Sequence, residues 1–238
     1  MKKISVENLT LLCDGKPLMT PLGRPLALPD AALTEMVAQE WRAQGNTPRK
    51  ETMPLTQIAC IAIDIASHQR LQLVDDILAY CDTDQICYRA GNIPELFALQ
   101  QETLDGLLAW AEDTLSLRLK ITEGIMPIAQ PPENRVKLEA HLQQYDIWQL
   151  AVLASVVKPL SSIVIALAFI EGHLDADHAF SASHLEESFE TAQWGADDEK
   201  EARLERLLED IRAAGAFLAV LKQSGKHTTM IFYKKIFR

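Results

Sequence analysis

The sequence of 238 residues lacks the usual signatures of a catalytic or cofactor-binding protein. Its ten glycines stand singly, and it contains no P-loop, GxGxxG, GxSxG or HExxH motif. Four cysteines form no CxxC pair and have no histidine at zinc-ligand spacing, which indicates small buried thiols in a reducing compartment. These absences argue against a nucleotide-dependent or zinc-dependent enzyme, and we expect no cofactor and no metal.

The chain also lacks an excess of basic residues and an uninterrupted apolar run long enough to cross a membrane. Its formal net charge is −10, whereas a nucleic-acid-binding protein is expected to carry a basic surface. The longest apolar run, 150–170, is interrupted by Lys158-Pro159 and Ser161-Ser162, and a lysine in mid-bilayer costs roughly 3 kcal/mol. The first ten residues carry no apolar stretch of a secretory signal. We therefore expect a soluble protein with buried helices over 150–170, no membrane insertion and no nucleic-acid partner.

The first 45 residues predict a small α/β layer. Strands over 9–13 and 16–20 flank Asp14-Gly15, a strong hairpin signal because both turn positions need positive φ. A third strand is predicted over 24–28. Asp30 then stands as the N-cap of a helix whose apolar stripe includes Trp41.

The remainder of the chain is predicted to be mainly helical. Residues 86–88 form a short strand or a loop, and 118–128 are expected to form a strand that returns to the N-terminal sheet. The fold class is therefore α+β, with an α/β domain over 1–60, which the returning strand would join, and a mainly helical domain over 61–238. The basic tail 224–238 is expected to be mobile. The predicted helices are 55–66, 69–80, 94–115, 133–145, 147–157, 160–171, 176–193 and 197–223.

Two clusters of titratable residues are candidate sites. The densest, around His173, Asp175 and His178, spans a predicted helix end and helix start, so helix capping is favoured over metal binding.

The other cluster contains Glu186, Glu187 and Glu190. With Leu185 and Phe189 on the buried stripe, helical geometry puts Glu187 on the outward face, where Trp194 follows seven residues later. An exposed acid beside an exposed indole suits a protein contact. From the residues alone, a plain solvated face is favoured, and paired carboxylates for acid–base chemistry form a third reading.

Six segments in the right order then identify a resemblance. The chain resembles the assembly chaperones of the ATP synthase alpha subunit, the ATP-twelve family. The resemblance implies an α/β domain followed by a helical domain, no catalysis and no small-molecule substrate. It also implies that the protein binds newly made alpha subunit, shields the surface that later meets the beta subunit, and prevents aggregation. The matching segments are 11–29, 37–45, 53–64, 82–90, 121–132 and 184–195.

The resemblance also assigns roles to single residues. Aligned on Trp194-Gly195, the critical acid of the family falls on Glu187, and a family tryptophan falls on Trp41. We therefore expect partner binding at Glu187, Trp194, Glu190 and Glu186, with Trp41, Asp14, Gly15 and Gly195 as structural matches. The chain departs from the family at His184, where arginine is usual, and at Glu190, where glutamine is usual.

The resemblance also bears on localisation and on the competing function. A bacterial, cytoplasmic member is expected, or a protein of the mitochondrial matrix if the chain is a processed eukaryotic form. The alternative is a hydrolase or lyase that uses Glu186, Glu187 or Glu190 with a histidine. That reading requires these carboxylates to converge with a histidine in a closed pocket.

Overall fold

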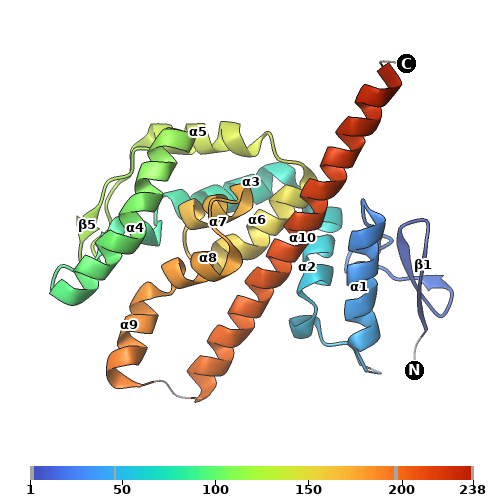
Figure 1. Ribbon diagram of the computed structural model, residues 1–238, viewed down its shortest axis with the longest axis horizontal. Helices are drawn as coiled ribbons and strands as arrows, with labels where there is room; N and C mark the ends of the chain where they lie inside the picture. Colours follow the sequence, from blue (N-terminus) through green and yellow to red (C-terminus); the bar gives the residue numbers. More distant parts are fainter. Residues whose placement is uncertain (1–2, 46, 196–197, 237–238) are drawn as a thin grey trace.

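A three-stranded antiparallel sheet forms one end of the molecule in the computed structural model, which describes residues 3–45, 47–195 and 198–236 (Figure 1). Its strands are β1 (Ile4–Glu7), β2 (Thr10–Cys13) and β3 (Lys16–Pro17), in the order β1-β2-β3. Asp14 and Gly15 have φ of 50° and 77°, as the predicted hairpin between β2 and β3 requires. Residues 24–28 add isolated bridges, Thr10 to Ala27 and Met19 to Pro25, rather than the full strand that was predicted.

Strand β1 was not predicted from the sequence. It joins β2 through a turn in which Asn8 and Leu9 both have positive φ, at 47° and 63°. Leucine rarely adopts this conformation, so the sequence carries no turn signal at this position. The meander is therefore one strand longer at its start than predicted.

Helix α1 (Ala31–Ala43) covers this sheet and begins as predicted, because the Asp30 side chain accepts hydrogen bonds from the amides of Ala32 and Leu33. Glu40, near the end of α1, accepts hydrogen bonds from the amides of Leu55 and Thr56 at 2.9 and 2.8 Å. It thereby caps the following helix, α2 (Pro54–Cys60), from outside.

One buried acid joins the meander to the helices. Helix α2 continues into a π-helical turn, Ile61–Ala66, which carries Asp64. The Asp64 carboxylate accepts hydrogen bonds from the Thr20 hydroxyl at 2.7 Å, the Leu22 amide at 3.1 Å and the Arg24 guanidinium at 3.1 Å. The predicted division of the chain into 1–60 and 61–238 falls at the junction of α2 and this turn.

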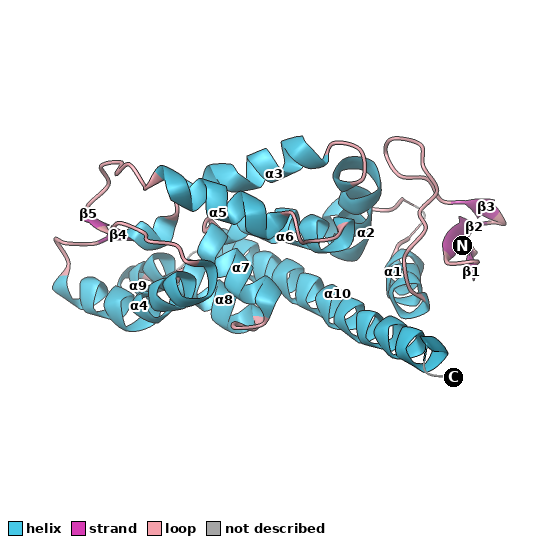
Figure 2. Ribbon diagram, turned by 90° about the horizontal axis from the view of Figure 1, so that it is seen from above, coloured by secondary structure: helices cyan, strands magenta, loops and turns pink. Residues whose placement is uncertain are grey.

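The other helices surround an apolar hairpin made of α6 and α7. Figures 1 and 2 show α10 crossing the body diagonally, with α4, α5 and α9 at the end opposite the sheet. No helix among the described residues is long and apolar enough to cross a membrane. The helices are α3 (Arg70–Leu78), α4 (Pro94–Leu115), α5 (Pro132–Leu142), α6 (Ile147–Leu160), α7 (Ile163–Glu171), α8 (Ala176–Ser183), α9 (Leu185–Trp194) and α10 (Asp198–Ile236), and 3₁₀ turns span Lys50–Thr52, Ala79–Cys81 and Gln85–Cys87.

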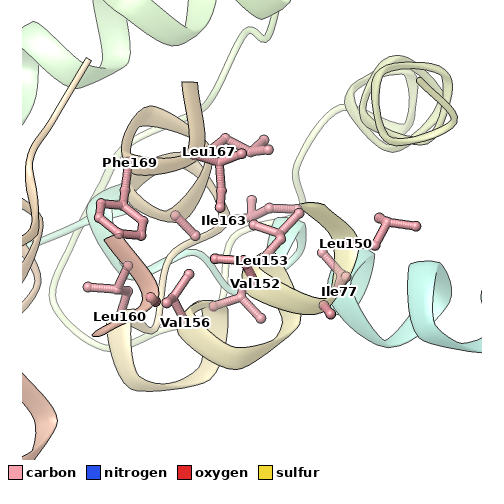
Figure 3. Packing of buried hydrophobic residues seen from close by; sticks show 14 of the residues in the cluster. Ile77, Leu150, Val152, Leu153, Val156, Leu160, Ile163, Leu167 and Phe169 are labelled. Carbon is pink, nitrogen blue, oxygen red and sulfur yellow. The ribbon is translucent and has the colours of Figure 1, made fainter. Parts of the chain in front are cut away.

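The run 150–170 forms the predicted buried hairpin. Helix α6 ends at Leu160, Ser161 adopts φ of 48°, and the Ser162 side chain accepts from the Ile165 amide at 3.0 Å to start α7. Apolar side chains of both helices interlock in the core (Figure 3). The apolar run is thus explained by burial in the protein.

Three predictions about the helical region need correction. The segment 118–128 does not return to the N-terminal sheet. Its short strand β5 (Thr122–Glu123) pairs in parallel with β4 (Tyr88–Arg89), and Figure 2 shows this pair at the end of the molecule opposite β1. The alternation of residues in 118–128 indicated a strand but could not identify its partner.

The other two corrections concern helix bounds. The helix predicted over 176–193 is broken at His184, which has φ of −109° and ψ of 24° and separates α8 from α9. Helix α10 was predicted to end at 223 but continues to Ile236. The contacts of the basic side chains beyond 223 lie outside the described residues.

Candidate functional site

The candidate site is the region where α9 approaches α4, α6 and α10. A hollow of about 760 Å³ lies between these elements, and its lining includes His184, Glu186 and Glu187 together with Arg203 and Asp210 of α10. Figure 1 shows the end of α9 and the start of α10 at the same edge of the molecule. Two of the three predicted acids therefore line one hollow, and Glu190 does not.

Glu187 faces α10. Its side chain is 25% exposed and forms an ion pair with the Arg203 guanidinium, and the Lys200 ammonium lies 3.8 Å from the same carboxylate oxygen. The prediction that Glu187 lies on an outward, solvated face is therefore wrong. The helical geometry was sound, since Leu185 and Phe189 are half-buried, but the side chains of Arg203 and Lys200 reach from α10 to Glu187 on the face that geometry left open.

Glu186 connects α9 to α4. Its carboxylate accepts a hydrogen bond at 2.7 Å from the side-chain amide of Gln100, a buried residue of α4. The Gln100 carbonyl oxygen in turn accepts from the Ala90 amide at 2.8 Å, next to β4. Glu186 thus connects α9 to α4. Glu190, by contrast, is exposed and has no ion pair among the residues with described side chains.

Trp194 is the last residue of α9 and one of the most exposed large apolar side chains of the described chain, with 71% exposure. Gly195 follows with φ of 81°, a conformation that favours glycine, and ends the helix. An indole in this position is available to another molecule.

His184 is buried at the break between α8 and α9. Its ring stacks on Phe180 at a centroid distance of 4.3 Å, and its Nδ1 lies 2.8 Å from Ser183 Oγ and 3.2 Å from the Phe180 carbonyl oxygen. Burial lowers the pKa of His184, and the charge of Glu187 opposes that shift. The Ser183 hydroxyl donates to the Phe180 carbonyl at 2.9 Å, so its proton is not directed at the His184 ring. Within the described residues, Ser183 and His184 are therefore not arranged as the serine–histidine pair that a hydrolase uses.

The other residues singled out from the sequence have structural positions. The hairpin residue Asp14 accepts from the Lys3 amide at 2.9 Å, and Trp41 packs half-buried against the core with its indole Nε1 unpaired within the described part of the chain. Asp175 caps α8 by accepting from the His178 amide at 2.8 Å, which confirms the capping interpretation. No group that could hold a metal ion occurs among the described residues.

Sequence reasoning missed Arg203, Lys200 and Gln100 as parts of this site. Arg203 lies 16 residues after Glu187, and Gln100 lies 86 residues before Glu186. No periodicity connects such distant positions. The only available signal was the mixture of acidic and basic residues near the start of α10.

Comparisons with known proteins place this geometry in context. The family model described as ATP12 chaperone protein matches residues 1–112. The crystal structure of Atp12 from Paracoccus denitrificans is 34% identical, with a TM-score of 0.80, and the match covers 92% of this chain and 94% of that one. A candidate chaperone from Agrobacterium tumefaciens is 35% identical, with a TM-score of 0.83, over 92% of this chain and 84% of that one. The mitochondrial protein atp12 of Schizosaccharomyces pombe is 25% identical over 206 residues, which are 82% of this chain and 71% of that one.

Proposed function

The chain belongs to the ATP12 chaperone family, and on that premise we propose that it is an assembly chaperone of the ATP synthase that binds the alpha subunit of the synthase head. It holds this client before assembly, shields the surface through which the client meets its neighbour, and thereby prevents aggregation. An unassembled subunit exposes apolar interface, and such surfaces aggregate. We place the protein in the cytoplasm of a bacterium, since two of the similar solved structures are bacterial.

The observation that carries the proposed site is the exposure of Trp194 at the free end of α9. Exposed tryptophans are rare on soluble proteins and supply much of the binding energy where proteins meet. The exposed acid Glu190 lies on the same helix and provides part of a polar rim. We propose that α9 presents Trp194 as the apolar anchor for the client.

Glu187 lies on the side of α9 that faces α10 and has a supporting role in the proposed site. Its carboxylate is bound to Arg203 and approached by Lys200, so its charge is already compensated by groups of α10. We propose that Glu187 is a positioning residue that holds α9 against α10 and so fixes the direction in which Trp194 points. Glu186, through Gln100, does the same toward α4.

The alternative, a hydrolase or lyase, is disfavoured by the geometry of the same hollow. Glu187 is paired with Arg203, Glu186 accepts from the Gln100 amide, and the Ser183 hydroxyl beside His184 donates to the Phe180 carbonyl. Glu190 does not line the hollow. Within the described residues no hydrogen bond joins Glu186 or Glu187 to His184, so the carboxylate–histidine pair that this alternative requires is not formed.

The first experiment measures light scattering of isolated alpha subunit without ATP, in the presence of the chain or its variants. Trp194→Ala should weaken the protection by at least about tenfold in the concentration required, because removing a central aromatic anchor costs about 2 kcal/mol or more. Leu71→Ala is the matched control, since Leu71 of α3 is 84% exposed and has no proposed role. Equal loss in both variants, or in neither, would remove Trp194 from the proposed site.

A second experiment separates positioning from direct contact. Glu187→Lys places a cation against Arg203 and Lys200 and should weaken client protection by about tenfold or more, because like charges repel. Combining Glu187→Lys with Arg203→Glu restores an ion pair of reversed polarity. If Glu187 positions α9, the double variant regains most of the protection. If Glu187 pairs with the client, the double variant stays as weak as the single one, and the positioning role is wrong.

A further inference from the structure

A second exposed feature lies at the end of the molecule that carries β5. The strand-like segment 118–124 runs beside α4 and pairs on one edge only, because β4 and β5 form a two-stranded sheet. Main-chain groups of successive residues in a strand point to opposite edges. The first edge of the segment carries the main-chain groups of residues 118, 120, 122 and 124. The second edge carries those of residues 119, 121 and 123.

The first edge is fully engaged. The amide and carbonyl of Arg118 bond to the Asn134 side chain at 3.1 and 2.9 Å, and those of Lys120 bond to the Gln130 side chain at 2.9 Å each. Gly124 donates to the Arg89 carbonyl of β4 at 2.8 Å. The side-chain amides of Asn134 and Gln130 thus extend the row of main-chain hydrogen bonds that β4 forms with β5.

The second edge is open. No hydrogen bond within the described part of the chain reaches the main-chain groups of Leu119 or Ile121, and the ladder with β4 leaves those of Glu123 pointing away. Unpaired strand edges are templates for another extended chain. This edge therefore offers three consecutive outward positions to such a chain.

The surroundings of the open edge are apolar and acidic. Ile121, Ile125 and Met126 are 46%, 93% and 74% exposed, an unusual concentration of apolar surface for one loop. Ile121 also borders a hollow of about 510 Å³, whose lining is mainly polar and consists of Arg89, Phe97, Gln101, Asp105, Ile121, Thr122 and Glu123. Asp105 is paired with buried Arg89, whereas Glu123 is exposed and has no ion pair among the residues with described side chains.

We propose that an extended segment of the client adds to this open edge as a third strand, with an apolar side chain against the exposed Ile125 and Met126 and a basic side chain in the hollow near Glu123. The inference rests on the proposed function, because it adds a second contact to the same client. The unpaired main chain calls for an extended segment, and the apolar tip and free carboxylate call for apolar and basic residues. A chain of net charge −10 also favours a basic segment over an acidic one.

Hydrogen exchange tests the main-chain contact directly. With isolated alpha subunit bound, the amides of Ile121 and Glu123 should exchange at least about tenfold more slowly, because each becomes a donor to the added strand. The amide of Gly124, which already donates to Arg89, serves as the internal control. Unchanged exchange at Ile121 and Glu123 in a client-saturated sample would overturn the proposal. Slowed exchange in concentrated chain without client would identify the occupant as a second copy and would overturn it as well.

A variant tests the energy of the contact. Ile121→Pro removes one outward amide while sparing the ladder with β4, and should weaken client binding about fivefold or more. Ile121→Val keeps the amide and an apolar side chain, so its binding should match that of the unaltered chain. Equal affinity of the proline and valine variants would contradict strand addition. If the unaltered chain binds no alpha subunit at all, the proposed function fails instead, and the two failures are distinguished.

Discussion

At the scale of single residues, the most informative position is the buried imidazole of His184. It breaks the helix predicted over 176–193, stacks on Phe180 and lies beside the ion pair of Glu187 and Arg203. The break separates α8, which packs on α10, from α9, which contacts α4 and reaches α10 through the ion pair of Glu187 with Arg203. A polar residue in a helical sequence thus takes its role from burial, which the sequence pattern did not show.

His184 predicts a pH dependence of stability. Its pKa is lowered in the folded protein by burial, while an unfolded histidine titrates at about 6.5. Below that pH the unfolded chain binds a proton that the folded chain resists, so the free energy of unfolding falls as pH drops through this range and is fully retained above it. Urea unfolding at pH 8 and at pH 5.5 should show the unaltered chain losing more stability than His184→Gln. A difference between the two proteins that stays constant with pH would contradict this.

At the scale of elements, the π-helical turn Ile61–Ala66 joins the two parts of the molecule. It directs Asp64 toward the meander, where three donors from 20–24 meet one buried carboxylate. π-Helical turns often occur where a helix must redirect a functional side chain. This buried acid is one of the links that position the N-terminal sheet on the helical body, together with Glu40 and the packing of α1 on α2 and α10.

Replacing Asp64 should therefore loosen the meander. Asp64→Asn removes the charge that Arg24 pairs with and leaves one donor facing an amide hydrogen, at a cost of about 1–3 kcal/mol in unfolding free energy. Hydrogen exchange at the Leu22 amide should accelerate in parallel, because that amide loses its acceptor. Asp75→Asn is the control, since the ion pair of Asp75 with Arg135 is exposed and should contribute less than about 1 kcal/mol. Equal stability of the two variants would show that Asp64 does not join the parts.

At the scale of the whole molecule, α10 packs on helices from both the early and the late part of the chain. It packs on α1 and α2 at one end and on α6, α7 and α8 along its length, as Figure 1 shows. Phe217 on its buried face is fully inaccessible and lies 6.1 Å, ring to ring, from Trp148 of α6. One helix thus links the early and late parts of the chain into one packed unit.

A cavity at Phe217 should accordingly weaken the entire fold. Phe217→Ala should lower the unfolding free energy by about 3–5 kcal/mol, the usual cost of removing a buried aromatic side chain. Tryptophan fluorescence and circular dichroism should report one shared, shifted transition, because α10 connects all layers. Arg206→Ala, an exposed change on the same helix, should leave the midpoint almost unchanged. Two separate transitions in the Phe217 variant would show that the sheet and the helices unfold independently.

The sequence by itself determined the local elements of this protein. The helix predicted over 94–115 matches α4 residue for residue, the Asp14-Gly15 turn and the Asp30 cap are present, and the run 150–170 forms a buried hairpin. These features depend on interactions within a few residues, which periodicity, turn chemistry and capping record directly. The six ordered segments likewise indicated the family before the fold was known.

Only the tertiary structure decided what lies beside what. The partner of β5, the ion pair of Glu187 with Arg203, the hydrogen bond of Glu186 with Gln100 and the burial of His184 all join distant segments. Helical geometry correctly placed Glu187 opposite Leu185, yet it gave no sign that Arg203 of α10 would pair with it there. Local patterns constrain which side of an element is apolar, whereas the identity of its neighbour depends on chain topology and packing.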